Sequence, residues 1–382
     1  MKVLVFGGSF DPPHRAHLLL LKAALKRWRP DLAYVVPAGR SPFKARSRAP
    51  GAARKELLRF LLSKLPPRLS RRVRVLDWEL RRKRVSYTYQ TLREVRRRHP
   101  DAEIAFLTGA DAFADMGAWK RAGELRRSYG WIVGRRRGAP RPRPRGRART
   151  LLLPGTFPRV SSSEARVRLL TDQAPSALLP GRVLRAIDAR GLYGRRAHDA
   201  LRRGLEPKRY RHALLVARKA VELAERHGTD PETAALAGLL HDCGRLMAPQ
   251  RMPAFARARR LRVPHLRAMA RRRPGLLHAY VGAFLARDRF GVRDPIVLGA
   301  VRDHTFGGTR MSALGRLVAV ADACSQDRDY PGVERIRRLA REDLPAAFLQ
   351  VMRMKLEHVL RRGHWLHPLA ATLWNRATGD AR

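Results

Sequence analysis

The chain carries two patterns of apolar residues, and the change from one to the other comes near residue 193. Up to that point, short apolar runs alternate with amphipathic stretches. The runs that predict strands are 3–6, 33–36, 73–76, 104–107, 131–133 and 151–153. The amphipathic stretches that predict helices include 18–27, 55–65 and 88–98. Strands that alternate with helices are typical of an α/β domain, in which a parallel sheet is covered by helices on both faces.

From Tyr210 onward the spacing of apolar residues is helical almost throughout. The longest helical patterns cover 212–226, 231–240, 281–290, 296–303, 312–323 and 333–339. Between the two patterns, residues 194–207 carry glycine, proline and charge without sustained periodicity, which indicates a linker. We therefore expect an α/β domain over 1–193, a linker over 194–207 and an all-α domain over 208–382.

The first chemical signal is the string GGSFDPPHRAH at residues 7–17, directly after the first predicted strand. Paired glycines allow a tight turn and a close approach of the backbone to a ligand. A helix that begins near Pro13 would direct its free N–H groups at an anion. Since His14 and His17 are about one helical turn apart, both imidazoles can share one face and bond phosphate oxygens. The segment therefore predicts a phosphate site at the carboxyl edge of the sheet.

This string resembles the GGxFDPxHxGH signature of nucleotidyltransferases, and in particular that of bacterial nicotinate-nucleotide adenylyltransferases; Ala16 stands where the family has glycine. The resemblance implies a Rossmann-like fold. It also implies adenylyl transfer from ATP to nicotinate mononucleotide, which releases pyrophosphate with no covalent intermediate. His14, His17, Lys44 and Arg166 would act with Mg²⁺ to align the phosphates and neutralise their charge.

Further positions resemble the same family in order and spacing. They are the pyridine-nucleotide region Ser86, Tyr87 and Thr88, the Gly109, Asp111 and Trp119 set, and the helix start Ser161, Ser162 and Ser163 ahead of Arg166. Together with Gly7, Gly8, Ser9 and Phe10, these residues are the expected nucleotide-binding set. Serines at a helix start can cap it, and its N-terminus would hold the ATP phosphates.

The second chemical signal is an adjacent pair, His241 and Asp242, at the end of a predicted helix. The pair becomes informative together with other candidate ligands, which are His212, His278, His304 and Asp322. Imidazoles and carboxylates suit iron, manganese and similar ions, and six ligands suit two ions. Two metals can generate hydroxide at neutral pH and hold the oxygens of a phosphate ester.

The order of these residues resembles HD-domain metallophosphohydrolases, and the flanking residues resemble the symmetrical diadenosine tetraphosphate hydrolases of that type, which cleave the dinucleotide to two ADP. The resemblance implies a two-metal centre in which Asp242 is also catalytic. It also implies that Arg245 and Arg328 contact substrate phosphate. Cys243, Gly244 and Arg245 depart from the family pattern, and the resemblance ends near residue 340.

Net charge and cysteine content add little to these assignments. The formal charge of +49 favours encounters with polyanions, but the arginines are scattered through every predicted element, so we expect no specific nucleic-acid partner. Residues 135–149, rich in arginine and proline, predict a surface loop. Two cysteines and the lack of a long apolar run indicate a cytoplasmic protein in a reducing compartment, without a membrane partner. The sequence leaves oligomerisation open.

We interpret the chain as a fused bifunctional enzyme that makes nicotinate adenine dinucleotide and hydrolyses dinucleoside polyphosphates. Three alternatives stay open at this point. The chain can be an RNA-processing nucleotidyltransferase with an HD phosphohydrolase, its HD domain can act on other nucleotides, or one half can sense nucleotides without turnover. A missing polymerase-type carboxylate pair argues against RNA processing, and complete ligand sets in both halves argue against a sensor.

Overall fold

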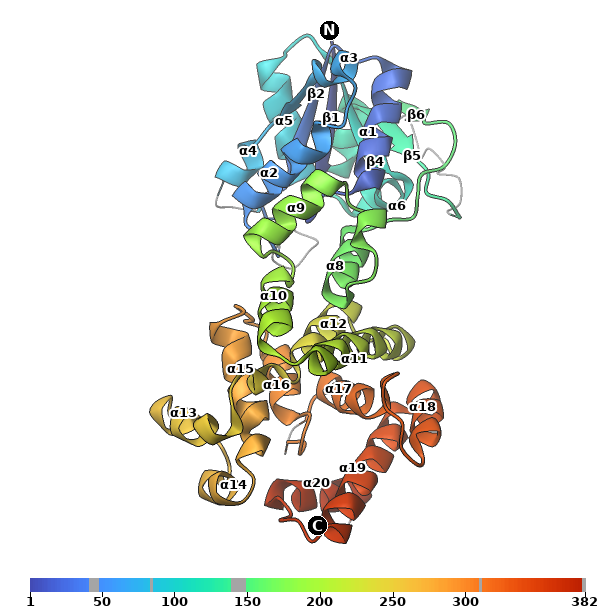
Figure 1. Cartoon of the computed structure of the whole chain (residues 1–382). Coiled ribbons are helices and arrows are strands. Elements are labelled where there is room, and N and C mark those ends of the chain that lie inside the picture. The colour runs from blue at the N-terminus through green and yellow to red at the C-terminus, as the bar shows by residue number, and fades with distance from the viewer. Residues whose placement is uncertain (41–47, 83–84, 139–148, 309–310, 380–382) are drawn as a thin grey trace. The chain divides into compact units, whose positions relative to one another are not determined.

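The computed structural model describes residues 1–40, 48–82, 85–138, 149–308 and 311–379. The chain forms two compact units (Figure 1). One comprises residues 1–166 and 174–193, and the other comprises residues 167–173 and 194–382. None of the helices within these ranges is long and apolar enough to cross a membrane.

The first unit is built on a parallel sheet of six strands in the order β3-β2-β1-β4-β5-β6. The strands are β1 (Lys2–Gly8), β2 (Leu32–Pro37), β3 (Val73–Val75), β4 (Glu103–Gly109), β5 (Gly130–Gly134) and β6 (Thr150–Leu152). Each lies on a predicted apolar run. The strand order reverses between β1 and β4, and ligands of such sheets bind at the carboxyl ends of the strands beside that reversal.

Helices lie between these strands and, for the last two helices, after β6. They are α1 (Arg15–Trp28), α2 (Gly51–Leu62), α3 (Pro67–Ser70), α4 (Trp78–Arg81), α5 (Thr88–Arg98), α6 (Ala110–Ala114), α7 (Ala122–Ser128), α8 (Ser162–Thr171) and α9 (Gly181–Arg190). Leu92 of α5, Phe113 of α6 and Leu125 of α7 pack in one buried cluster with Val3 and Val5 of β1. Val3 and Val5 alternate along β1, so their side chains point to the same side of the strand. These helices therefore cover that face of the sheet.

The second unit is helical, as predicted. Its main helices are α10 (Arg195–Gly204), α11 (Pro207–Arg226), α12 (Pro231–Leu240), α13 (Met252–Ala258), α14 (Leu266–Arg272), α15 (His278–Asp288), α16 (Pro295–Asp303), α17 (Ala313–Cys324), α18 (Val333–Glu342), α19 (Leu344–Arg361) and α20 (Pro368–Thr378). A core of buried alanine, leucine and valine side chains joins α11, α12, α16 and α17. The small residues of α12 allow α11 to approach closely, since a methyl group added at Gly238 would meet the backbone of Ala217 at 2.8 Å.

The segment 194–207, which we expected to be a linker, forms helix α10 over most of its length. Ala197, His198 and Leu201 are buried, and Ala197 and Leu201 belong to the core of the second unit. Helix α10 buries only four residues, Ala200 being the fourth, and among glycines and paired arginines these do not form a recognisable apolar pattern in the sequence. Residues 139–148 of the predicted surface loop lie outside the described residues.

Candidate functional site

The end of β1 and the start of α1 bring the two N-terminal histidines together. Their rings are stacked, with centroids 3.6 Å apart. The backbone N–H of His14 donates to Nδ1 of His17 at 3.1 Å, so the neutral His17 ring carries its proton on Nε2. Both imidazoles therefore lie at the helix start, and Nε2 is the donor nitrogen of the neutral His17 ring.

The start of α8 is joined to the same segment. The backbone N–H of Glu164 donates to Oγ of Ser161 at 3.0 Å, which caps the helix. Oγ of Ser162 donates to the carbonyl of Pro12 at 2.9 Å. Arg166 donates to the carbonyl of Asp11 at 2.6 Å and to Oγ of Ser163 at 3.0 Å. The predicted serines and arginine thus lie beside the histidine segment, although about 150 residues separate them in sequence.

Two residues that sequence reasoning missed hold this segment in place. The buried carboxylate of Asp11 accepts from the N–H of Arg48 at 2.7 Å and from the hydroxyl of Tyr193 at 2.7 Å. Burial, and then this carboxylate, raise the pKa of Tyr193, which keeps its hydroxyl a donor. The second residue, Arg54, is buried and donates to the carbonyls of Ser9 at 2.7 Å and Ala38 at 2.8 Å. In sequence, Arg54 looks like any other arginine of this basic chain.

A cavity of about 710 Å³ opens beside the segment, a size usual for ligand sites. Its lining includes the predicted residues Gly7, Gly8, Ser9, Ser86, Tyr87, Thr88 and Trp119. Glu79 also lines it, and its buried carboxylate accepts from Oγ1 of Thr91 at 2.5 Å and from the N–H of Gly39 at 3.3 Å. Burial raises the pKa of Glu79. These contacts join α4, which carries Glu79, to Gly39 after β2 and to Thr91 of α5.

Other predicted positions stand apart from this cavity. Phe10 is fully buried and meets the His17 ring edge-on, with centroids 4.9 Å apart, so its side chain positions a histidine and does not face a ligand. Asp111 is exposed and pairs with Arg136 at 3.2 Å. Gly109 is the residue before α6 and is not among the lining residues. Lys44 lies outside the described residues.

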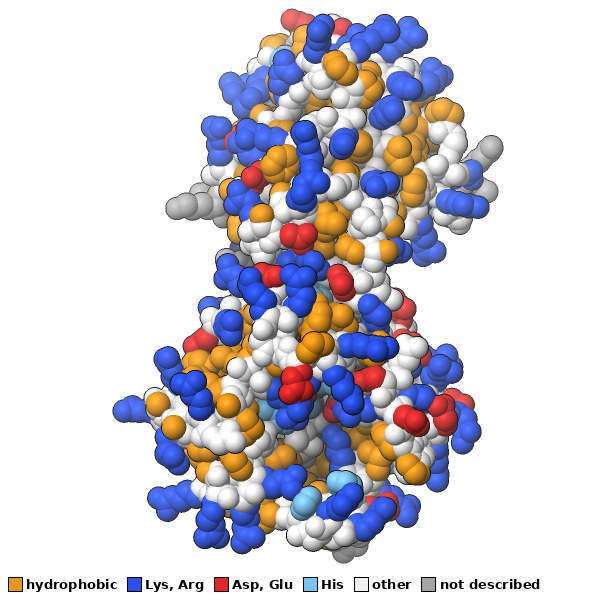
Figure 2. All heavy atoms as spheres, in the orientation of Figure 1, with side chains coloured by type: hydrophobic (Ala, Val, Ile, Leu, Met, Phe, Trp, Pro, Cys, Tyr) orange, Lys and Arg blue, Asp and Glu red, His pale blue; other side chains and the backbone are white. Residues whose placement is uncertain are grey.

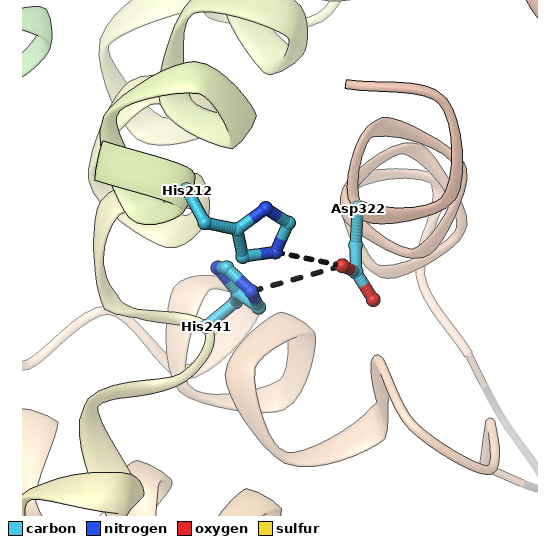
Figure 3. A group of neighbouring side chains, drawn as sticks. All are labelled: His212, His241 and Asp322. Atoms are coloured by element: carbon cyan, nitrogen blue, oxygen red, sulfur yellow. Dashed lines mark hydrogen bonds and ion pairs between the residues drawn. The ribbon is translucent and has the colours of Figure 1, made fainter. Parts of the chain in front are cut away.

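The second unit gathers all six predicted metal ligands. Nε2 of His212 lies 3.1 Å from Oδ1 of Asp322, and Nε2 of His241 lies 3.9 Å from the same oxygen (Figure 3). His241, Asp242 and His304 form a second group of potential ligand atoms within 4.8 Å of one another. The sixth residue, His278, has Nε2 at 3.1 Å from Oδ1 of Asp242. His241 is common to both groups.

The other ring nitrogen of each histidine is bound away from this centre. Nδ1 of His241, His278 and His304 each lies 2.7 to 2.8 Å from the backbone carbonyl three residues earlier. Nδ1 of His212 instead lies 2.8 Å from a carboxylate oxygen of Asp327. Because a carbonyl or carboxylate only accepts, each Nδ1 carries a proton, which leaves Nε2 as the nitrogen through which each ring would bind a metal.

The electrostatics fit divalent cations. Nε2 of His241 is buried and has no hydrogen-bond partner among the described residues, although two carboxylates lie nearby. Burial lowers the pKa of His241 and lowers that of His304 to about 3, so both rings stay neutral. Burial alone would raise the pKa of Asp242 and Asp322, but their hydrogen bonds with histidines and nearby cations hold both well below the usual range. The set thus combines the neutral imidazoles of His241 and His304 with two ionised carboxylates. Burial lowers the pKa of His212, but the hydrogen bond and charge of Asp322 outweigh it and raise that pKa.

Two arginines lie against the carboxylates. Nε of Arg245 is 2.7 Å from Oδ2 of Asp242, and Arg328 donates to Oδ1 of Asp322 at 2.5 Å. Gly244 is one of the three residues that depart from the family pattern, and the structure gives a steric reason for glycine there. A methyl group at this position would lie 1.9 Å from the carbonyl oxygen of His278. Glycine lets this turn approach α15, and both predicted phosphate-binding arginines adjoin the ligand set.

Sequence reasoning missed two residues of this site. Asp327 holds His212, and Oγ of Ser325 donates to the other oxygen of Asp327 at 2.7 Å. Lys355 of α19 donates to the carbonyl of His304 at 3.2 Å. Sequence patterns offered no reason to select Lys355, because the resemblance to the hydrolases ends near residue 340. Asp327 could have been suspected in the sequence only because it follows the candidate ligand Asp322 by five residues.

Comparisons with known proteins agree with the two units. Residues 5–168 match the family described as cytidylyltransferase-like, and residues 209–327 match the HD domain. A probable nicotinate-nucleotide adenylyltransferase/Ap4A hydrolase of Mycoplasma genitalium is 26% identical, over 91% of this chain and 96% of that protein.

Two relatives match one half each. A symmetrical bis(5'-nucleosyl)-tetraphosphatase of Bacillus subtilis is 34% identical over 43% of this chain and 86% of its own length. A probable nicotinate-nucleotide adenylyltransferase of Exiguobacterium sibiricum is 32% identical over 50% of this chain and 99% of its own length.

Proposed function

The chain belongs to the nicotinate-nucleotide adenylyltransferases through its first half and to the symmetrical bis(5'-nucleosyl)-tetraphosphatases through its second, and from this premise we propose a bifunctional enzyme with two separate active sites. The first transfers the adenylyl group of ATP to nicotinate mononucleotide. The second hydrolyses diadenosine tetraphosphate to two ADP. The observation that supports the proposal is that the six candidate metal ligands lie close together in the second unit, while the stacked histidines adjoin the start of α8 in the first.

In the first unit, the acceptor phosphate attacks the α-phosphorus of ATP, the bond to the β-phosphate breaks, and pyrophosphate leaves. The stacked histidines and the start of α8 lie where these phosphates would bind, at the carboxyl edge of β1. The donor on His17, the fixed charge of Arg166 and Mg²⁺ carried with ATP would stabilise the charge that develops. Tyr87, Thr88 and Trp119 would hold the pyridine nucleotide in the cavity.

In the second unit, we propose that His212, His241, Asp242, His278, His304 and Asp322 hold two ions, for which iron or manganese suits the mixed nitrogen and oxygen donors. Such ions lower the pKa of a bound water and stabilise charge on a phosphate. The protein would fix the ligand geometry through the four Nδ1 hydrogen bonds, and Arg245 and Arg328 would bind phosphate oxygens.

The RNA-processing alternative is less favoured. Lys and Arg side chains are spread over the visible face of each unit and do not gather on one element (Figure 2). A relative that matches 91% of the chain carries both proposed activities in its name.

The test is product analysis with the full chain. With nicotinate mononucleotide, ATP and Mg²⁺ we expect nicotinate adenine dinucleotide and pyrophosphate. With diadenosine tetraphosphate and manganese or iron(II) we expect ADP alone. Formation of ATP and AMP would contradict symmetrical cleavage, and transfer to phosphopantetheine in preference to nicotinate mononucleotide would contradict the acceptor assignment.

A further inference from the structure

The part of the chain after the HD match has no assigned role, yet it lines the cavity that contains the metal ligands. Helices α19 and α20 follow α17 and α18 in the second unit, and α19 packs against α17, which carries Asp322 (Figure 1). The cavity measures about 720 Å³, within the usual range for ligand sites. Asp242, His304 and Asp322 line it together with Lys355 and Trp365.

The cavity lining contains both cationic and aromatic side chains. Lys355 lies at the metal ligands, where Nζ reaches the carbonyl of His304, and Arg245 and Arg328 pair with the ligand carboxylates. These three cations surround the place where a phosphate would be cleaved. The same lining includes aromatic rings and the exposed Arg273 and Arg361.

Trp365 and Tyr330 are the large aromatic side chains of the described lining that are partly exposed, and the indole of Trp365 is the larger ring. The ring of His367 is buried and stacks on Phe306 at 4.4 Å, and its Nδ1 accepts from the N–H of Leu369 at the start of α20. His367 and Phe306 therefore support the wall. Trp365 meets His367 edge-on at 5.3 Å and stays partly exposed in the cavity.

We propose that Trp365 and Arg361 form a subsite for a nucleoside at the end of the polyphosphate substrate, with the base stacked on the indole ring. Indole is a large aromatic surface, and nucleobases stack on such rings with little dependence on their identity. Arg361 would contact the phosphate next to that nucleoside. The proposal rests on the proposed hydrolase function, because it takes a substrate with a nucleoside at each end of a phosphate chain.

Calorimetric titration of the metal-loaded full chain tests the subsite. The ligands are ADP, which has a base, and pyrophosphate, which has none. The variants are Trp365→Ala, Trp365→Phe and the control Trp374→Ala, on α20 outside the cavity lining. The first unit is identical in all of them, so any nucleotide it binds cancels between variants.

We expect Trp365→Ala to weaken ADP binding at the second unit by about 5- to 150-fold and to leave pyrophosphate binding unchanged. Trp365→Phe should restore most of the affinity, and Trp374→Ala should match the wild type. Equal ADP affinity in wild type and Trp365→Ala would overturn the subsite, as would an equal loss for both ligands. Failure of the wild type to cleave diadenosine tetraphosphate would reject the hydrolase function separately, because the titration compares ligands without turnover.

Discussion

The two candidate sites are built in opposite ways. In the first unit, one contiguous segment at the end of β1 carries both histidines of the proposed phosphate site, and Asp11 and Arg54 hold that segment. In the second unit, side chains from separate helices form the site, and its partners His212 and Asp322 are 110 residues apart. A site made by one segment appears in the sequence as a motif, whereas a site made by many helices appears as scattered single residues.

The largest effect should come from the second site. Asp242→Ala removes a carboxylate that adjoins His278, His241 and Arg245, so we expect loss of bound metal and of diadenosine tetraphosphate cleavage, with adenylyl transfer unchanged. Metal analysis of the purified protein and both assays measure this. The exposed Asp329→Ala is the control. A variant that keeps its metal and cleaves the substrate would refute the ligand assignment.

A smaller loss is expected in the first site. His17→Ala removes one donor to phosphate, which is typically worth about 10² to 10³ in rate. Dinucleotide synthesis should fall by that factor while hydrolysis stays at the wild-type level. His99→Ala, which removes a histidine bound to Tyr34, is the control in the same unit. Undiminished synthesis by the His17 variant would remove this residue from the site.

Asp327 contacts one candidate ligand, His212, and its other carboxylate oxygen accepts from Ser325. Asp327→Ala should weaken metal binding by about 10- to 100-fold, the usual effect of removing the partner of a ligating imidazole. Asp327→Asn keeps an acceptor for Nδ1 and should recover part of that affinity. Competition with a metal-binding dye gives the affinities. Identical affinities in all three proteins would mean that Asp327 does not position His212.

The smallest effect concerns a histidine outside both sites. Burial lowers the pKa of His198 to about 4. The unfolded chain, with a pKa near 6.5, therefore takes up the proton first, so the stability from neutral His198 is present above about pH 6.5 and is lost as the pH falls toward 4. His198→Gln should lose less stability than wild type between pH 7 and pH 5, by about 2 kcal/mol.

Urea unfolding at the two pH values measures this difference. The exposed His358→Gln is the control and should follow the wild type. Equal losses in wild type and His198→Gln would show that His198 does not remain neutral in the fold.

Periodicity was sufficient for the elements of the sheet and for most helices of the second unit, because long apolar patterns determine them. It was not sufficient for α10, which buries few residues on a short helix. The six candidate metal ligands were chosen from their residue types and order, and the structure brings them close together. Asp327, Lys355 and Arg54 were not, since their roles depend on where a distant backbone carbonyl or imidazole comes to lie. Phe10 was assigned to the ligand, but its ring fills the core.

The central claim is that one chain contains two active sites, of which only the second depends on metal held by protein side chains. The most direct test removes tightly bound metal from the full chain with a chelator, returns it to Mg²⁺ and measures both reactions on the same sample. We expect adenylyl transfer to persist, and hydrolysis to be absent until manganese or iron(II) is restored. Loss of transfer together with hydrolysis, or hydrolysis at full rate in Mg²⁺ alone, would contradict the claim.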